Sequence, residues 1–299
     1  MPRIIREILI SQMRLARPIF KRMELDSVRK YQDFIGTLQA KILGSKVRYL
    51  EEHFDGFKAE WAIPQKIEND NVVLYLHGGS YTAGSLTYAK GFGGVLANKL
   101  SCRVLCVGYR LAPEFPFPSG LNDAVSAYKR ILEKHPAKNI SFIGESAGGG
   151  MCFALCLKLK EEAVPLPACV VALSPWTDLT FTSKSYQGNS EHDPSMSEDS
   201  LRYSAKLYFG NENPKNPLIS PIYGDLEGLP PCFLIAGNSE ILEDDTRIMA
   251  EQLMKYGVKV KTIIAEGMWH VYVLFKIAEA KQALEEIKIF ISENCLEEK

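Results

Sequence analysis

The chain has 299 residues, of which 46% are hydrophobic and 24% are charged, and its formal net charge is −1. A core of this size needs no disulfide or metal to be stable, and the length fits one large α/β domain. The nearly balanced charge gives no electrostatic support for a nucleic-acid-binding protein, and no apolar run is long enough to cross a membrane.

The seven cysteines lie mostly inside apolar runs. Cys152 and Cys156 are four residues apart, on one face of a predicted helix, and no C-x-x-C or Cys/His cluster has zinc spacing. The N-terminal apolar block at 8–10 is short and is interrupted by Gln12 and Arg14, so we expect no signal peptide. These features favour a cytoplasmic protein with buried, reduced thiols.

The segment 1–44 contains no convincing strand, and its apolar residues recur at helical spacing. They are Ile4, Ile5, Ile8, Leu9, Met13 and Leu15. Up to Lys30 the segment has eight Lys or Arg against three acids. A basic amphipathic helix of this kind could contact an anionic membrane. We favour the alternative, in which its apolar face packs on the rest of the protein.

From residue 46 onward the pattern changes to short β-rich runs, and 47–51 with 54–62 predicts an antiparallel edge pair. Strands then alternate with longer helices, which predicts a mostly parallel sheet covered on both faces. The predicted strands are 71–76, 103–107, 140–143, 169–173, 232–236 and 258–265, and the predicted helices are 88–100, 121–134, 151–159, 242–256 and 271–292. The polar stretch 177–216 breaks this alternation and predicts an insertion or lid with one helix at 198–209.

The run 144–148 reads GESAG and lies between the strand 140–143 and the helix 151–159. A serine on a sharp strand-to-helix turn projects its hydroxyl clear of the backbone, and small neighbours let both elements approach closely. The helix start also directs free N–H groups to that position. G-x-S-x-G alone is a weak signal; together with the two loops below, this setting indicates that Ser146 is a nucleophile.

A second loop follows the strand 71–76 and reads HGGS at 77–80. Its two glycines free the backbone so that N–H groups can point into a site. An acyl-transfer enzyme needs two or three such donors for its oxyanion, and each is worth roughly 3 kcal/mol of barrier. The predicted donor pool is the amides of Gly78, Gly79, Ser80 and Ala147, and which of them face the oxyanion stays open.

A serine hydroxyl needs a base, and histidine titrates in the right range. Of the five histidines, only His270 lies beyond a strand C-terminus without belonging to the glycine loop. The base in turn needs an acid, in the chain order serine, acid, histidine. The loop after strand 232–236 offers four carboxylates, of which Glu240 is closest to the strand end and Asp244 is the second choice.

These motifs together resemble the hormone-sensitive-lipase-like (bacterial family IV) carboxylesterases of the α/β-hydrolase superfamily. The runs that carry the resemblance are HGGSY at 77–81, YRLAPE at 109–114, GESAGG at 144–149 and SPWTDL at 174–179. The similarity covers roughly residues 46–290. The chain departs from the family pattern at Ser80, which replaces a glycine, at Glu145, which replaces the commoner Asp, and at Glu240, where many members have Asp.

The resemblance implies an α/β-hydrolase fold with an eight-stranded, mostly parallel sheet and a helical cap. We expect residues 1–45 and 177–216 to form the cap, and residues 46–176 and 217–299 to form the catalytic domain. It also implies that Ser146, His270 and Glu240 act as a triad. The replacement at Glu145 is expected to matter little.

The resulting hypothesis is a serine carboxylesterase for short- to medium-chain esters that works through an acyl-enzyme. No metal or organic cofactor is required, and the expected partner is a small-molecule ester, without nucleic acid and without stable membrane insertion. The resemblance also suggests a homodimer through the sheet edge. Candidate pocket residues are Tyr81, Tyr109, Trp176 and Met196, although packing is the expected role of each taken singly.

Three alternatives remain. A lactonase, amidase or deacetylase would use the same catalytic residues. A non-catalytic ligand-binding homologue would be expected to lose the nucleophile or the base, and this chain retains Ser146 and His270. A membrane-docked lipase for long chains would make use of the basic N-terminal segment.

Overall fold

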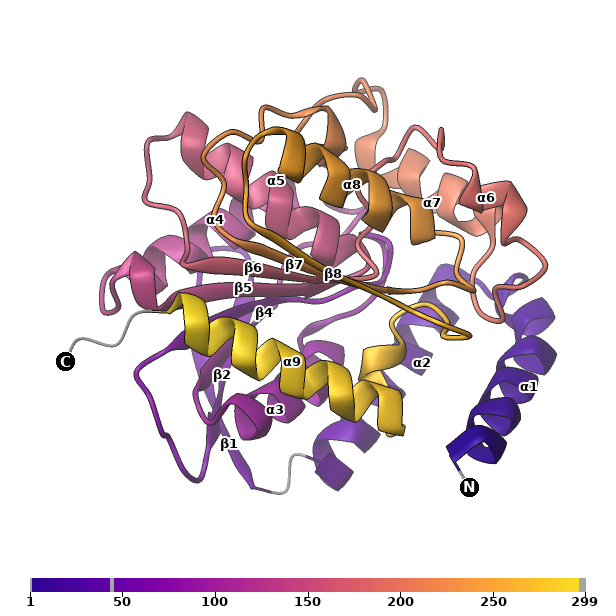
Figure 1. The fold of residues 1–299 in the computed structure, drawn as a ribbon, viewed down its shortest axis with the longest axis horizontal. Coiled ribbons are helices and arrows are strands. Elements are labelled where there is room, and N and C mark those ends of the chain that lie inside the picture. The colour runs from indigo at the N-terminus through magenta and orange to yellow at the C-terminus, as the bar shows by residue number, and fades with distance from the viewer. Residues whose placement is uncertain (1, 44–45, 296–299) are drawn as a thin grey trace.

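The computed structural model describes residues 2–43 and 46–295 of the chain. An eight-stranded sheet runs through the molecule with helices on both sides (Figure 1). The strands are β1 (Val47–His53), β2 (Lys58–Pro64), β3 (Val72–Leu76), β4 (Arg103–Gly108), β5 (Ile140–Glu145), β6 (Cys169–Leu173), β7 (Cys232–Gly237) and β8 (Val260–Ala265). The helices are α1 (Pro2–Phe20), α2 (Leu25–Leu43), α3 (Leu86–Leu100), α4 (Ser119–Leu132), α5 (Ala147–Glu161), α6 (Ser185–Gly188), α7 (Glu198–Phe209), α8 (Glu243–Lys255) and α9 (Ala278–Asn294).

The strand order is β1-β2-β4-β3-β5-β6-β7-β8. Strands β1, β2 and β4 pair antiparallel at one edge, and every pairing from β4 to β8 is parallel. The central strands are buried along their whole length, as near-continuous apolar runs require when helices cover both faces. The predicted fold class, the antiparallel edge pair and the parallel core are therefore confirmed.

Two apolar cores lie on the two faces of the sheet. Side chains alternate along each strand, so that in β3 Leu74 packs with α5 while its neighbour Tyr75 packs with α3. Helices α4, α5 and α8 cover the first face, and α3 and α9 cover the second (Figure 1). Because the parallel strands share one direction, the loops after β3, β5, β6, β7 and β8 all emerge at the same edge of the sheet.

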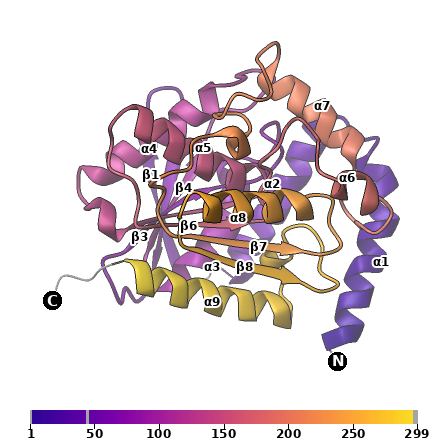
Figure 2. The same ribbon diagram turned by 45° about the horizontal axis from the view of Figure 1, so that its top comes forward.

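The N-terminal helices and the insertion after β6 lie side by side at that edge (Figure 2). The Arg17 guanidinium donates to the Ser190 carbonyl at 2.8 Å, and Lys21 Nζ lies 2.7 Å from Asp199 Oδ2. Helix α2 packs closely on α3, since a Cβ on Gly36 would come within 2.5 Å of Tyr88 Cα. Residues 1, 44–45 and 296–299, which the predicted cap and catalytic segments include, lie outside the described residues.

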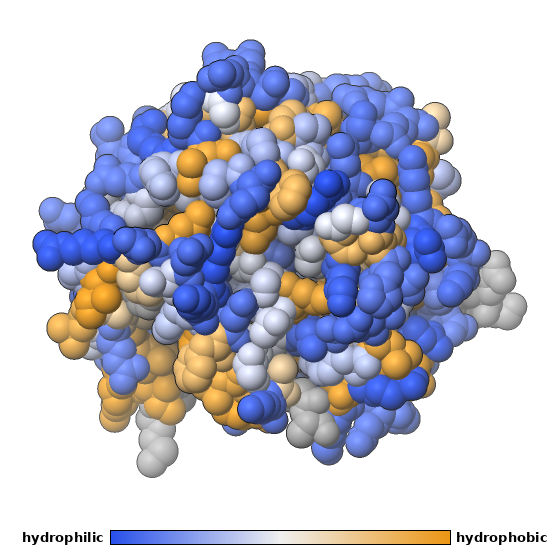
Figure 3. Space-filling model, turned by 180° about the vertical axis from the view of Figure 1, so that it is seen from behind, coloured by the Kyte–Doolittle hydropathy of each residue, from blue (hydrophilic) through white to orange (hydrophobic). Residues whose placement is uncertain are grey.

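Helix α1 makes only partial contact with the rest of the protein. Leu9, Ile10 and Met13 pack against the second core, but Ile4 is 63% exposed and Leu15 is 78% exposed. Apolar side chains gather on this side of the molecule, at the lower left of Figure 3. The expectation that the apolar face packs on the protein is half right, because a straight helix contacts the domain along one stripe only. No helix in the described part of the chain is long and apolar enough to span a membrane.

The last helix begins later than predicted. Val271 has φ 52°, a 3-10 turn spans Tyr272–Leu274, and α9 starts only at Ala278. A left-handed backbone is strained for a β-branched residue, and the Val271 amide is held by a 3.0 Å hydrogen bond to Ser174 Oγ. The predicted helix 271–292 is therefore wrong over its first two turns, because tertiary contacts overrule the apolar periodicity there.

Candidate active site

Ser146 occupies the turn between β5 and α5. Its backbone has φ 55° and ψ −122°, and its amide donates to the Leu173 carbonyl at 2.8 Å. Only glycine fits two positions to either side of it, because a Cβ on Gly148 would lie 2.0 Å from the Leu76 carbonyl oxygen and one on Gly144 would lie 2.3 Å from the Gly148 carbonyl oxygen. The sequence therefore builds the close strand–helix approach that projects the serine hydroxyl away from its own backbone.

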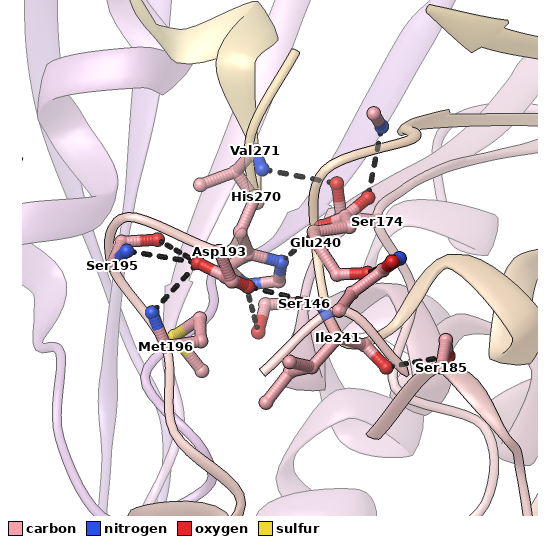
Figure 4. Close-up of polar contacts among 12 residues, drawn as sticks. Ser146, Ser174, Ser185, Asp193, Ser195, Met196, Glu240, Ile241, His270 and Val271 are labelled. Carbon is pink, nitrogen blue, oxygen red and sulfur yellow. Dashed lines mark hydrogen bonds and ion pairs between the residues drawn. The ribbon is translucent and has the colours of Figure 1, made fainter. Parts of the chain in front are cut away.

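Three side chains from three loops form one chain of hydrogen bonds (Figure 4). Ser146 Oγ lies 2.9 Å from Nε2 of His270, and Nδ1 of His270 lies 2.6 Å from Oε2 of Glu240. Glu240 is fully buried, and its other oxygen accepts the Gly237 amide at 2.9 Å. The three predicted residues thus lie within hydrogen-bonding reach of one another, in the arrangement that a serine nucleophile, a base and an orienting acid require.

The surroundings of His270 make its imidazole easier to protonate than that of an isolated histidine. Burial acts to lower the pKa of His270, but the hydrogen bond and the charge of Glu240, with further help from Asp193 and Glu145, raise that pKa above its ordinary value. An imidazole that readily accepts a proton suits a general base that must become charged during the reaction.

The second-choice acid, Asp244, faces another direction. Its carboxylate accepts the Ser185 amide at 2.9 Å, and its own amide donates to Ser185 Oγ at 3.1 Å. Asp244 stands in the first turn of α8 and therefore binds the insertion through α6. Among the four carboxylates of this loop, Glu240 is the one that the fold brings to His270.

The glycine loop after β3 lies beside Ser146, and one of its predicted donors is already engaged. The Gly78 amide donates to Glu145 Oε1 at 2.6 Å, while Glu145 Oε2 accepts the Tyr75 hydroxyl at 2.6 Å. Gly78 therefore leaves the predicted donor pool, because its N–H points at a buried carboxylate. Burial raises the pKa of Glu145 to about 7, against the lowering effect of these hydrogen bonds. The expectation that Glu145 matters little does not fit this contact.

The amides of Gly79, Ser80 and Ala147 have no protein acceptor among the described residues. Gly79 has φ 114° and Ser80 has φ 54°, and successive residues with unusual φ turn neighbouring N–H groups into one concave surface. Ser80 adopts the left-handed conformation without the freedom of the glycine it replaces, at a cost of order 1 kcal/mol. Three free amides next to a serine hydroxyl are what an oxyanion site needs.

His77 packs against the glycine loop and contacts its backbone. It is fully buried, its ring stacks on Tyr109 with centroids 4.2 Å apart, and its Nδ1 lies 2.7 Å from the Gly78 carbonyl oxygen. The Tyr109 hydroxyl donates to the His77 carbonyl at 2.6 Å. Burial lowers the pKa of His77 to about 4, so that its imidazole is neutral near pH 7 and is a weaker base than that of His270, whose pKa is raised.

Three of the four candidate pocket residues are packed inside the protein. Tyr81 stacks on Tyr208 at 3.9 Å, Tyr109 stacks on His77, and the Trp176 indole donates to the Tyr186 hydroxyl at 3.1 Å. Met196 is partly buried, and its amide donates to Asp193 Oδ1 at 2.8 Å (Figure 4). The three aromatic residues are therefore packed inside the protein, and Met196 is the candidate that keeps part of its surface exposed.

Two contributors were not assigned a role from the sequence. Ser174 follows β6, and its hydroxyl accepts the Val271 amide and also helps to lower the pKa of Glu240, which burial raises. Its position in the SPWTDL run after a strand was an available signal. Asp193, in the polar insertion, had no such signal.

Within the described residues, no group of three or more His, Cys, Asp or Glu side chains is arranged to hold a metal ion.

Comparison with known proteins gives consistent matches over most of the chain. A family model described as alpha/beta hydrolase fold matches residues 73–274. An acetyl-hydrolase of Streptomyces hygroscopicus is 35% identical over 236 residues, which cover 78% of this chain and 79% of that protein. An esterase of Acinetobacter venetianus is 34% identical over 223 residues, covering 73% of this chain and 74% of the relative.

Solved structures agree over nearly the whole chain. An esterase from the bacterial hormone-sensitive lipase (HSL) family has a TM-score of 0.90 at 34% identity, covering 97% of this chain and 98% of that one. The structure of EstE5 soaked with p-nitrophenyl butyrate has a TM-score of 0.90 at 30% identity, with the same coverage. The agreement extends beyond residues 73–274 to the N-terminal helices and the C-terminal helix.

Proposed function

The chain belongs to the alpha/beta hydrolase fold family, in its hormone-sensitive-lipase-like branch, and is a carboxylic ester hydrolase; on that premise we propose that Ser146, His270 and Glu240 are its catalytic triad. The observation that carries the assignment is the pair of hydrogen bonds on His270, 2.9 Å to Ser146 Oγ and 2.6 Å to Glu240 Oε2. This order of contacts supports the roles of nucleophile, base and orienting acid for the three residues.

In the first half of the reaction, Ser146 Oγ attacks the ester carbonyl while His270 Nε2 takes the hydroxyl proton. Glu240 holds the Nδ1–H of His270 and stabilises the imidazolium that forms. The negative oxygen of the tetrahedral intermediate binds the amides of Gly79, Ser80 and Ala147. The intermediate then collapses, the carbon–oxygen bond to the alcohol breaks, and His270 gives its proton to the departing alkoxide.

In the second half, a water molecule takes the place of the alcohol. His270 removes one proton from this water as its oxygen attacks the acyl-enzyme carbonyl, and the same amides stabilise the second oxyanion. Collapse of this intermediate releases the carboxylic acid and returns the proton to Ser146 Oγ. Every proton thus passes through His270 Nε2, and the proposed reaction requires no metal ion or organic cofactor.

We propose short- to medium-chain acyl esters as substrates. Ser146 is only 5% exposed and His270 only 6% exposed, so the acyl group must fit a covered site. The close packing of the aromatic rings at Tyr81 and Trp176 favours a small acyl site over a wide one. Support also comes from the named relatives, among them an acetyl-hydrolase and a structure soaked with a butyrate ester.

The cover itself is proposed to consist of residues 1–45 and 177–216, with residues 46–176 and 217–299 as the catalytic domain. The contacts of Arg17 with Ser190 and of Lys21 with Asp199 support a single cover built from both segments.

We also propose a cytoplasmic location, supported by the seven buried free cysteines. A homodimer formed through a sheet edge is a further proposal, which size-exclusion chromatography with light scattering tests.

The test of function is a chain-length series of p-nitrophenyl esters on wild type and Ser146→Ala. We expect turnover of the acetate and butyrate esters by wild type and a loss of about a million-fold in kcat in the variant. Wild-type inactivity on every ester, or activity that survives in Ser146→Ala, would contradict the assignment. A preference for long chains above their micellar limit would instead favour a lipase, and turnover of matched anilides would favour an amidase.

A further inference from the structure

Asp193 is a fully buried carboxylate in the insertion between α6 and α7. Its Oδ1 accepts three hydrogen bonds from its own loop: the Ser195 amide at 2.8 Å, the Ser195 hydroxyl at 3.0 Å and the Met196 amide at 2.8 Å. These contacts alone would make it an ordinary loop-forming aspartate. Its second oxygen, Oδ2, does something different.

Oδ2 of Asp193 accepts the amide of Ile241 at 3.0 Å, across 48 positions of the chain. Ile241 directly follows Glu240, so this hydrogen bond fixes the backbone next to the acid (Figure 4). Two neighbours act on the same two residues: Asn189 Nδ2 donates to the Glu240 carbonyl at 2.9 Å, and Ser185 Oγ donates to the Ile241 carbonyl at 2.7 Å. The segment 185–193 therefore holds the backbone at 240–241 through three side chains.

Asp193 also contributes charge to the site. The ionisable groups that face His270 come from three elements: Glu240 from the loop after β7, Asp193 from the insertion and Glu145 from the end of β5. Tyr272 lies nearby and feels the charge of Glu240, but it is not ionised near neutral pH because burial raises its pKa. The charge of Asp193 therefore adds to that of Glu240 in favouring the protonated imidazole.

We propose that Asp193 is a positioning residue for the triad: its carboxylate ties the covering insertion to the amide beside Glu240 and so holds this acid against His270. The inference rests on the proposed function, because it assumes that Glu240 and His270 act on Ser146. It assigns the insertion a part in the chemistry as well as in covering the site.

The test is Asp193→Asn, with kcat, KM and the pH profile of kcat/KM as readouts. An Asn of the same shape has one oxygen and one NH₂ group, so on one side an N–H must face another N–H. We expect a fall in kcat of about 10- to 100-fold, because small misplacements of catalytic groups cost this much, with KM within about threefold. We also expect the acid limb to move to lower pH by about half a unit, since the imidazolium loses a nearby negative charge.

Two control variants separate positioning from simple loop stability. Ser195→Ala removes one hydrogen bond to Oδ1 and leaves the charge and the Ile241 contact, so kcat and the acid limb should match wild type. Asp178 is another fully buried carboxylate of the same insertion, and its side chain accepts hydrogen bonds from Thr180 and Thr182. Its own amide donates to Asp245 at 2.9 Å, which the variant leaves in place. Asp178→Asn should lower the melting midpoint and leave the acid limb in place.

The inference is overturned if folded Asp193→Asn keeps kcat within threefold of wild type, or if its acid limb moves no more than that of Asp178→Asn. If Asp193→Asn fails to fold, Asp193→Glu takes its place, because this variant keeps the negative charge but shifts the carboxylate. We expect its kcat to fall about tenfold while the acid limb stays in place. A wild-type kcat in Asp193→Glu would overturn the inference. Inactive wild type, or active Ser146→Ala, would reject the triad itself; failure at Asp193 alone rejects only this inference.

Discussion

The loops at the sheet edge and the segments that cover them are held by different kinds of interaction. At the edge, buried carboxylates accept backbone amides: Glu240 accepts that of Gly237, and Glu145 accepts that of Gly78. In the covering segments, most charged contacts lie at the surface, as does the pair of Lys21 and Asp199, and Leu15 leaves most of its side chain in solvent. Asp178 and Asp193 are buried carboxylates of the insertion, and Asp193 is the one that accepts the Ile241 amide beside Glu240.

The difference follows from what each contact costs when it is broken. A buried donor or acceptor that loses its partner cannot turn to water, so its full desolvation penalty of about 1–3 kcal/mol remains. An exposed ion pair is replaced by hydration and contributes little. Breaking a contact at the edge should therefore cost more than breaking one in the N-terminal helices or the insertion.

The contrast predicts the largest effect at the acid. Glu240→Gln removes the negative charge that orients His270, and we expect kcat to fall about 1,000- to 10,000-fold, as for the acid of other serine triads. Asp244→Asn, which alters a carboxylate bound to Ser185, should stay within a few-fold of wild type. Steady-state hydrolysis of p-nitrophenyl butyrate measures both. A large loss in Asp244→Asn alone would make Asp244 the acid.

The glycine loop should give the next largest effect. Glu145→Ala leaves the Gly78 amide and the Tyr75 hydroxyl without their buried acceptor, and a looser loop should lower kcat about 10- to 100-fold. Glu145→Gln retains an oxygen that can accept the Gly78 amide and should lose no more than a few-fold. Equal kcat values in the two variants would show that the carboxylate contact does not position the loop.

The pH profile tests the charge arrangement at the edge. Only neutral His270 can take the serine proton, so kcat/KM should fall about tenfold for each pH unit below the pKa of this residue. Because Glu240 and its neighbours raise that pKa, the acid midpoint should lie above pH 6.5, the ordinary value. Circular dichroism at each pH shows that the protein stays folded. A midpoint below 6.5 would contradict the predicted direction.

The smallest effects should come from the cover. Arg29 on α2 donates to the Thr82 and Ala112 carbonyls and to both oxygens of Glu114. Arg29→Ala should raise KM about three- to tenfold and lower the melting midpoint by a few degrees, with kcat little changed. Lys21→Ala, at the exposed pair with Asp199, should change neither value measurably. A kcat loss in Arg29→Ala as large as that of Glu145→Ala would break the contrast between edge and cover.

Much of this arrangement could be predicted from the sequence. Apolar runs of strand length placed the strands close to their observed bounds, and the residues just beyond these runs supplied Ser146, His270 and Glu240. The choice of Glu240 over Asp244 rested on distance from the strand end, and the fold places only Glu240 beside His270. The four candidate oxyanion donors could not be narrowed from the sequence, because the partner of the Gly78 amide, Glu145, lies 67 positions away.

By itself, the sequence determined the fold class, the edge at which the chemistry gathers and the residue types that carry it, because periodicity and turn residues act over a few neighbouring positions. Only the tertiary structure decided where α9 begins, which amides stay free and how Asp193 reaches Ile241. These outcomes depend on pairs of groups far apart in the chain that burial forces to satisfy each other. No local pattern marks such a partner, since the need for it arises only when both groups leave water.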